Sequence, residues 1–267
     1  MKVDWLIPDW PAPSNVKALF TTRNGGVSVT PWDSLNLGDH VGDDAASVQA
    51  NRTLLQRACG AHAVFLKQVH GIDVLKLDAA TPDGSQADAC VTTQVGIACT
   101  IMVADCLPVL LTTQDGIAVA AAHAGWRGLA GVAAGGHRGV LESAFASLSA
   151  ATARASASKV IAWLGPCIGP TAFEVGAEVR LAFEAGQPGA GRFFVPVAPG
   201  KYLVDLAGLA RHRLQALGVS QVYGNDGSDA WCTVLNPDKY FSHRRDAGVD
   251  GNGFGTTGRM GALVWME

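Results

Sequence analysis

The sequence predicts an α+β fold in which mixed β-sheets are flanked by helices. Short apolar runs separated by Gly or Asp turns follow one another through the first half of the chain, a pattern typical of adjacent and partly antiparallel strands. Helical and strand-like segments then mix without the strict alternation of a doubly wound parallel fold. With 267 residues and no internal repeat, we expect one domain over residues 1–267.

The first half of the chain supplies most of the predicted strands. Residues 17–28, KALFTTRNGGVS, predict a strand that enters a hairpin turn at residues 24–26. Asp43 or Asp44 is placed to cap a helix over residues 46–59. The apolar residues of this helix fall roughly on one face and are Val48, Leu54, Leu55 and Cys59. Further strands are predicted at residues 63–70, 73–77, 89–93, 96–106, 108–113 and 116–124.

The second half of the chain mixes helices with strands. A helix is predicted from about residue 129 to 148, although it is weakened by Gly131, Gly135, Gly136 and Gly139. Residues 147–159 form a small, polar, Ala-rich stretch that fits either the end of this helix or a surface loop. Strands are predicted at residues 160–165, at residues 192–197 and at the end of residues 256–267, and helices at residues 178–186 and 204–218.

Charge and hydropathy patterning argue against several classes of protein. The net charge is −3 and the pI is near 6.1, whereas a nucleic-acid binder or a protein of anionic membranes needs a basic face. No apolar stretch reaches the ~18–20 residues of a membrane span, and the N-terminal residues carry no signal-peptide pattern. The six cysteines include no Cys-x-x-Cys pair, so free thiols are expected. We therefore expect a cytoplasmic protein that binds neither nucleic acid nor membranes.

Three strand-like runs end at or near a residue that binds metals, next to Gly or Pro. They are LKQVHG, VADCLP and AAHAGWRG, which carry His70, Cys106 and His123. Two imidazoles and a thiolate suit Zn²⁺ and can also accept copper, and three protein ligands leave a fourth position for water or substrate. From the residues alone, other interpretations stay open. Each histidine can be structural, and Cys106 can be a buried thiol or a nucleophile with either histidine as its base.

Arginines in turns that contain Gly or His are the second chemical signal. Arg23 lies in TTRNGG, Arg127 in AGWRG, and Arg244 and Arg245 in FSHRRD. Guanidinium groups suit phosphate and carboxylate, although a lone arginine is more often a surface residue. Residues 164–176, LGPCIGPTAFEVG, contain glycines that let the backbone approach a ligand, but lack the Lys and Ser/Thr ending of a P-loop.

Taken together, these motifs resemble the YfiH family. The resemblance is carried by TTRNGGVS, LNLG, KQVHG, ADA, ADCLPVLL, AHAGWRG, GPCIGP, FEVG, FSHRRD and the terminal TGRMGALVWM. It runs from about residue 17 to 266, and the combination is specific although no single motif is. The family has been described as a domain of unknown function, as a multicopper polyphenol oxidoreductase ("laccase") and as a purine nucleoside phosphorylase.

The resemblance implies a fold, a metal site and an activity. The expected fold is a cysteine-hydrolase-like α+β arrangement of mixed sheets. The expected metal is zinc, held by His70, Cys106 and His123, with copper as the older assignment. The expected reactions are phosphorolysis of adenosine, inosine, guanosine and methylthioadenosine, and deamination of adenosine. Purine nucleosides and phosphate are therefore the expected partners.

Chemical reasoning assigns roles within that activity. Zinc lowers the pKa of water to about 7, which deamination needs, and phosphorolysis needs arginines that orient the phosphate dianion. We expect Cys106, His123 and Arg127 to be catalytic, and Arg23, Arg127 and Arg245 to bind substrate or phosphate. Asp105 and Glu174 are weaker candidates for proton transfer.

Three other functions stay open. A copper-dependent polyphenol oxidase is disfavoured because multicopper sites need about ten His and Cys ligands and the chain has seven histidines. A Cys-His amide hydrolase acting on peptidoglycan precursors and a non-catalytic metal-binding protein are the others. The chain also departs from the family pattern, because Ala210 stands where the family tends to carry Asn and the stretch around His137 has no match in that pattern.

Overall fold

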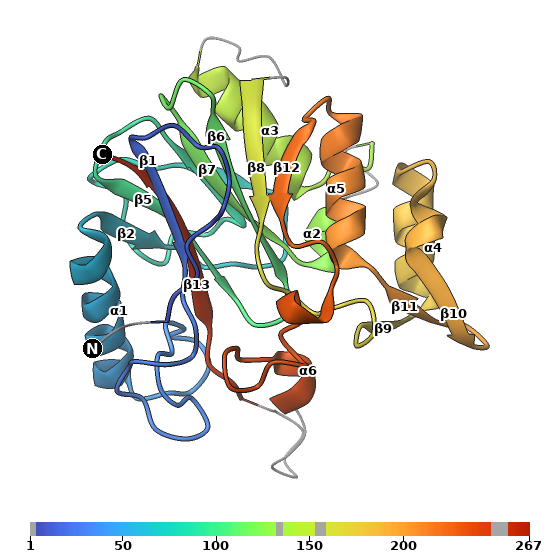
Figure 1. Cartoon of the computed structure of the whole chain (residues 1–267), viewed down its shortest axis with the longest axis horizontal. Coiled ribbons are helices and arrows are strands. Elements are labelled where there is room, and N and C mark those ends of the chain that lie inside the picture. The colour runs from blue at the N-terminus through green and yellow to red at the C-terminus, as the bar shows by residue number, and fades with distance from the viewer. Residues whose placement is uncertain (1–3, 132–135, 153–158, 247–255) are drawn as a thin grey trace.

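The computed structural model describes residues 4–131, 136–152, 159–246 and 256–267, and within them the strands form three sheets (Figure 1). The first has the order β1 (Val16–Phe20), β13 (Met260–Met266), β5 (Ile97–Val103) and β2 (His62–Phe65). The second has the order β12 (Gln221–Gly224), β8 (Val160–Leu164), β6 (Leu107–Thr113), β7 (Val119–Ala124), β4 (Ala89–Thr92) and β3 (Val74–Lys76). A small third sheet has the order β10 (Phe194–Ala198), β11 (Lys201–Val204) and β9 (Glu174–Gly176).

Both large sheets mix strand directions, as predicted. β2 runs parallel to β5, while β13 is antiparallel to both of its neighbours. In the six-stranded sheet the outer pairs β12–β8 and β3–β4 are parallel and the inner pairs are antiparallel. The predicted α+β arrangement of mixed sheets flanked by helices is therefore confirmed.

The two large sheets pack face to face, with helices on their outer faces. Side chains alternate along β5, so Cys99 and Ile101 join the apolar layer between the sheets while Ala98 and Met102 face helix α1 (Ala45–Cys59). Helices α3 (Val140–Ala151) and α5 (Leu206–Ala216) cover the other side of the six-stranded sheet. Figure 1 shows α1 on one flank of the molecule and α5 on the other. Strands buried on both faces explain the continuous apolar runs of the sequence.

The predicted helix caps and faces agree closely with the structure for α1. Asp44 is the cap residue, and its carboxylate accepts a hydrogen bond of 2.9 Å from the Ser47 amide. Val48, Leu55 and Cys59 are buried, but Leu54 is exposed, so its placement on the buried face was wrong. The remaining helices are α4 (Ala177–Gly186) and α6 (His243–Asp246), with short 3₁₀ helices at Ala190–Phe193 and Asp229–Trp231.

Two further local predictions were wrong. The segment predicted as one helix contains α2 (Trp126–Ala130) and α3, because Gly131 takes a φ of 84°, a left-handed conformation that ends the helix. Residues 132–135 of that prediction, and residues 153–158 of the Ala-rich stretch, lie outside the described residues. The second error is the hairpin at residues 24–26, since β1 pairs with the C-terminal strand β13 instead of a neighbouring strand.

The C-terminal strand closes the first sheet between β1 and β5, which places Met266 beside Val16 at the start of β1. Strands β9, β11 and β12 lie outside the predicted strands. Among the described residues, no helix has the length and apolar character needed to cross a membrane.

Candidate metal centre and active site

Three separate segments bring His70, Cys106 and His123 together. His123 is the penultimate residue of β7, Cys106 immediately precedes β6, and His70 lies in the loop that follows β2. β6 and β7 pair antiparallel with Pro108 opposite His123, which places the start of one strand beside the end of the other. The ligand atoms of the three residues all lie within 4.8 Å of one another, and Sγ of Cys106 is 3.8 Å from Nε2 of His70.

The backbone at two of these segments takes an uncommon conformation. His70 has a φ of 61° and Asp105, the residue before Cys106, has a φ of 86°. Non-glycine residues occupy this left-handed region rarely, and hydrogen bonds hold both residues there. Asp105 accepts 2.5 Å and 2.6 Å hydrogen bonds from the Thr233 hydroxyl and the Arg244 amide. The sharp turn at Asp105 thus positions the thiol of Cys106.

Asp88 holds two residues of the cluster in place through hydrogen bonds, a role that the sequence did not reveal. This side chain is fully buried immediately before β4, and its carboxylate lies 2.9 Å from Nδ1 of His123. It also accepts hydrogen bonds of 3.1, 2.8 and 2.7 Å from the amides of Val69, His70 and Gly71. Burial acts to raise the pKa of Asp88, but the hydrogen bonds from His123 and Gly71 outweigh it and lower that pKa. The ADA motif, a carboxylate between small apolar residues, was the available signal.

Hydrogen bonds and close packing also fix the His70 loop and the backbone that follows His123. The side-chain amide of Gln68 donates to the Met102 carbonyl and accepts from the Met102 amide, each at 2.8 Å, which anchors the His70 loop to β5. Gly125 lies directly against the cluster, since a Cβ at this position would be 2.9 Å from Sγ of Cys106 and from Cδ2 of His70. The glycine after His123 is therefore required by the close approach of the backbone.

The electrostatics of the unliganded cluster favour a thiolate and an imidazolium. Burial acts to raise the pKa of Cys106, but the positive charge of His123 and hydrogen bonds from both histidines outweigh it and lower that pKa to about 6. Burial likewise disfavours charge on His123, but the Cys106 thiolate and the Asp88 carboxylate raise its pKa to about 9. The thiol is thus already deprotonated at neutral pH, as metal binding requires.

The donor set fits a metal ion. A tetrahedral zinc ion with bonds of about 2.3 Å to sulfur and 2.0 Å to nitrogen separates those two donors by about 3.5 Å, close to the observed 3.8 Å between Cys106 and His70. Asp88 fixes the Nδ1 side of His123, so Nε2 is left for the metal, as in carboxylate–histidine–metal arrangements. His70, Cys106 and His123 can therefore hold a metal and leave a coordination position open.

The cluster lies in the wall of a cavity of about 370 Å³, within the roughly 300–1,000 Å³ of small-molecule sites. Apolar and aromatic side chains form part of the wall, among them Met102, Trp126, Ile168, Phe173 and Leu206. Polar side chains line it as well, among them His40, Gln68, Asp105, His243, Arg244 and Arg259. A ligand in this cavity meets the metal-binding group, flat apolar surfaces and positive charge together.

Comparison with known proteins decides the family. The model of the family described as "Multi-copper polyphenol oxidoreductase laccase" matches residues 17–267. The chain belongs to this family. Its relatives include the proteins named YfiH, so the resemblance to the YfiH family is confirmed.

Relatives of the YfiH family match the chain over nearly its whole length. The chain is 46% identical over 264 residues to "Purine nucleoside phosphorylase PA4543" of Pseudomonas aeruginosa, with 98% of each chain covered. It is 44% identical over 263 residues to "Purine nucleoside phosphorylase YfiH" of Escherichia coli, again with 98% of each covered. Among solved structures, NMB0706 of Neisseria meningitidis, described as DUF152, gives a TM-score of 0.87 at 44% identity, with 99% of each chain covered.

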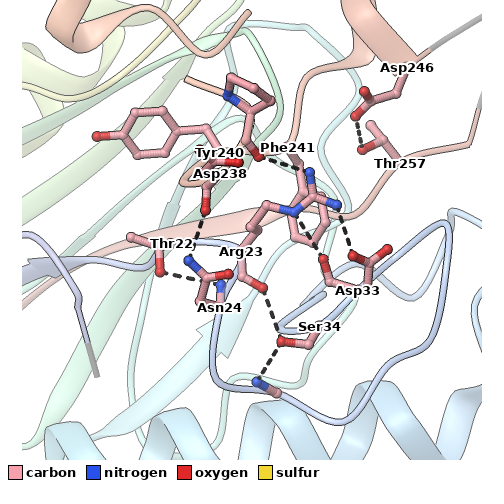
Figure 2. Close-up of polar contacts among 12 residues, drawn as sticks. Thr22, Arg23, Asn24, Asp33, Ser34, Asp238, Tyr240, Phe241, Asp246 and Thr257 are labelled. Atoms are coloured by element: carbon pink, nitrogen blue, oxygen red, sulfur yellow. Dashed lines mark hydrogen bonds and ion pairs between the residues drawn. The ribbon is translucent and has the colours of Figure 1, made fainter. Parts of the chain in front are cut away.

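Within the YfiH fold, the predicted phosphate-binding arginines lie apart from the cavity lining. Figure 2 shows Arg23 beside Asp33 and Phe241. Its guanidinium donates to the carbonyls of Asp33 and Pro237, each at 3.0 Å, and lies 4.8 Å from the centre of the Phe241 ring. Such contacts hold the loop after β1 against the segment before α6.

Arg245 and Arg127 lie outside the cavity lining too. Arg245 donates to the Asp246 carboxylate at 2.8 Å and to the carbonyls of Thr233 and Tyr240. Arg127 is exposed on α2 and stacks over the Trp126 ring, 4.4 Å from its centre. Of these residues, only Trp126 is part of the cavity lining.

The two candidate proton carriers have different surroundings. Asp105 lines the cavity, but each of its carboxylate oxygens already accepts a hydrogen bond. Glu174 is exposed, lies 3.7 Å from Nζ of Lys201 and is not part of the cavity lining. Arg259 and His40, which sequence reasoning did not single out, do line the cavity.

Proposed function

We propose that the chain is a zinc-dependent purine nucleoside phosphorylase that also deaminates adenosine. The observation that carries the proposal is the group of His70, Cys106 and His123 in the wall of a cavity of nucleoside size. The names of the relatives support it, since several relatives at 42–46% identity are named purine nucleoside phosphorylase. An enzyme of this kind takes small purine nucleosides and phosphate as substrates.

Zinc is the metal that the donors favour. Thiolate and imidazole ligands suit zinc, and a set of three leaves the open position typical of catalytic sites. Among the described residues, His70, Cys106 and His123 form the one cluster of side chains that could hold a metal ion. A multicopper oxidase needs several copper sites. Copper remains compatible with one such group, and metal analysis separates the two. When bound, zinc supplies a Lewis acid in the cavity wall.

In phosphorolysis, an oxygen of hydrogen phosphate forms a bond to the anomeric carbon of the ribose. The glycosidic C–N bond breaks, and its electron pair goes to the purine nitrogen, which takes up the proton that hydrogen phosphate carried. The products are the free base and ribose 1-phosphate. The chain's part is to hold both substrates in line and exclude water, for which Phe173 and Trp126 provide flat apolar walls.

In deamination, water adds to C6 of adenosine and ammonia leaves, so inosine forms. Both reactions place a purine nucleoside in one cavity, and one metal-binding group serves both. Cys106 and His123 act here as metal ligands, while the predicted catalytic role of Arg127 requires that its exposed guanidinium turn toward the cavity.

A Cys-His amide hydrolase is the second candidate, and one observation favours it. Cys106, His123 and Asp88 form a thiolate–imidazolium–carboxylate series with the charge states of a cysteine hydrolase. The two functions differ in their response to metal. A chelator abolishes activity of the metal enzyme and spares that of the hydrolase.

The deciding experiment combines metal analysis with assay of the purified protein. The parent is expected to hold one zinc per chain and to release hypoxanthine from inosine only when phosphate is present. His123→Ala is expected to lose both the zinc and the activity, while Arg57→Gln, an exposed position on α1, retains both. Retention of zinc by His123→Ala, or no product from any purine nucleoside with zinc bound, would contradict the proposal.

A further inference from the structure

We propose that Arg244 and Arg259 form the phosphate subsite of this cavity, in place of Arg23, Arg127 and Arg245. This inference rests on the proposed function for its reaction, but its geometry stands on the cavity itself. Among the described residues, Arg244 and Arg259 are the arginines that line the cavity, and they line it together with His70, Cys106 and His123.

Both guanidinium groups have hydrogen-bond donors to spare. Within the described ranges, neither forms an ion pair, whereas Arg23 and Arg245 each pair with a neighbouring carboxylate. Nη1 of Arg259 donates to the carbonyls of Thr257 and Gly258, and Nη1 of Arg244 donates to the Glu174 carbonyl at 3.1 Å. Since a guanidinium carries five N–H donors, each group retains donors and its full charge for an anion.

The LNLG motif holds Arg259 in place. The Arg259 amide donates to Oδ1 of Asn36 at 2.8 Å, and its carbonyl accepts from the Leu37 amide at 3.1 Å. A Cβ at Gly38 would lie 2.7 Å from Cγ of Arg259, so only glycine leaves room for this side chain. Burial lowers the pKa of Arg259, and the negative charges of Cys106 and Asp105 oppose that effect. Arg259 is thus a preorganised cation within electrostatic reach of the metal-binding thiolate.

Two other motifs hold Arg244. Its amide donates to Oδ2 of Asp105 at 2.6 Å, which connects it directly to the turn that carries Cys106. Its guanidinium lies 5.6 Å from the centre of the Phe173 ring and donates to the Glu174 carbonyl, so the FEVG segment sets its direction. Among the described residues that line the cavity, Asp105 is the one that carries a carboxylate, and its two oxygens already accept hydrogen bonds from Thr233 and Arg244.

The chemistry of this arrangement selects a compact dianion. Two guanidiniums without carboxylate partners suit the several oxygens of phosphate, and guanidinium forks bind such oxygens in pairs. The side chains of Phe173, Ile168 and Leu206 form an apolar wall that carries no charge to compete for the guanidinium groups. We infer that the nucleoside packs against this wall while phosphate binds the two arginines. Inorganic phosphate held by Arg244 and Arg259 would therefore lie beside the metal-binding group, where the proposed reaction needs it.

The test is titration of the zinc-loaded protein with inorganic phosphate by calorimetry, without nucleoside. Arg244→Gln and Arg259→Gln are each expected to raise the Kd for phosphate about tenfold to a hundredfold, as loss of a charge-assisted hydrogen bond does. Arg57→Gln is the matched control of equal charge change and is expected to bind phosphate like the parent. Zinc content and melting temperature verify that each variant is folded. Arg259 is more buried than Arg244, so if Arg259→Gln does not fold, the result for Arg244→Gln decides the test.

Steady-state kinetics separate this inference from the proposed function. The variants are expected to raise KM for phosphate tenfold or more and to change KM for inosine less than twofold. Unchanged phosphate binding in both variants, or its loss in Arg127→Gln instead, overturns the subsite. Absence of phosphate binding by the parent overturns it as well. Phosphate binding that depends on Arg244 and Arg259, in a protein that cleaves no nucleoside, overturns the function and supports the subsite.

Discussion

The Asp88 carboxylate joins two side chains of the candidate metal-binding group, because it lies 2.9 Å from Nδ1 of His123 and accepts a 2.8 Å hydrogen bond from the amide of His70. One buried carboxylate therefore sets the ring orientation of His123 and the loop conformation of His70. The residues that it connects are far apart in the chain, and Asp88 and His123 are separated by 35 positions.

Asp88→Asn is expected to weaken metal binding about tenfold to a hundredfold, the usual effect of losing a partner of a ligating histidine. Asn preserves the shape of the side chain but carries no charge, and it presents one acceptor oxygen where the carboxylate presents two. Competition with a chromophoric chelator measures the affinity. Asp78→Asn, in an exposed turn, is the control, and equal affinities for the two variants would contradict the proposed role of Asp88.

Metal removal is expected to make Cys106 reactive at unusually low pH. Its pKa of about 6 means that the thiolate forms as the pH rises through 6, so alkylation by iodoacetamide in the chelated protein should reach half of its maximal rate there, compared with about 8.5 for an ordinary thiol. Zinc should protect the thiol. The other five cysteines are buried, so the chelated Cys106→Ala variant should incorporate little label. A half-maximal rate near pH 8.5 would show that His123 does not stabilise the thiolate.

Gly125→Ala is expected to remove most of the bound metal while the protein stays folded. The added methyl group would lie 2.9 Å from atoms of both Cys106 and His70, and these side chains must move apart to accept it. Gly84→Ala is a useful comparison, because Gly84 has a φ of 79° and no neighbouring atoms, so this change strains only the backbone. Metal content and melting temperature of the two variants separate lost ligation from lost stability. Full metal content in Gly125→Ala would sink the prediction.

Arg213→Met is expected to lower the free energy of unfolding by about 3–5 kcal/mol, as the loss of one partner of a buried ion pair does. The guanidinium of Arg213 is buried on α5, pairs with Glu142 at 2.8 Å and donates to the carbonyls of Leu129 and His137. It thereby holds together the two helices α2 and α3 where a single helix was predicted. Urea denaturation measures the change. Arg180→Met, which removes an exposed pair with Glu184, should cost far less, and equal losses would contradict this account.

Local patterns were sufficient for most of the secondary structure. The β-like runs between residues 63 and 124 correspond to β2, β3, β4, β5, β6 and β7, because each run is short, apolar and bounded by turn residues. The wrong predictions of the single helix and of the hairpin share one cause. Both features depend on contacts with residues that are distant in the sequence. The helix ends at Gly131 where Arg213 donates a hydrogen bond to the Leu129 carbonyl, and β1 pairs with the C-terminal strand β13.

The sequence by itself determined the fold class, the family and the residue types of the candidate metal-binding group. His70, Cys106 and His123 each lie at or near the end of an apolar run, and the ends of strands are recognisable from composition. Their convergence came from the resemblance, because gaps of tens of residues carry no distance information.

Only the tertiary structure decided which polar side chains share the cavity. The sequence favoured Arg23, Arg127 and Arg245 over Arg244, yet carbonyls, carboxylates and an aromatic ring engage the first three outside the cavity. Asp88 and Arg259 lie in the ADA and TGRMGALVWM motifs, but those motifs gave neither side chain a role. A side chain's partners depend on which strands pair and which loops meet. In this chain, those pairings join residues that are more than two hundred positions apart.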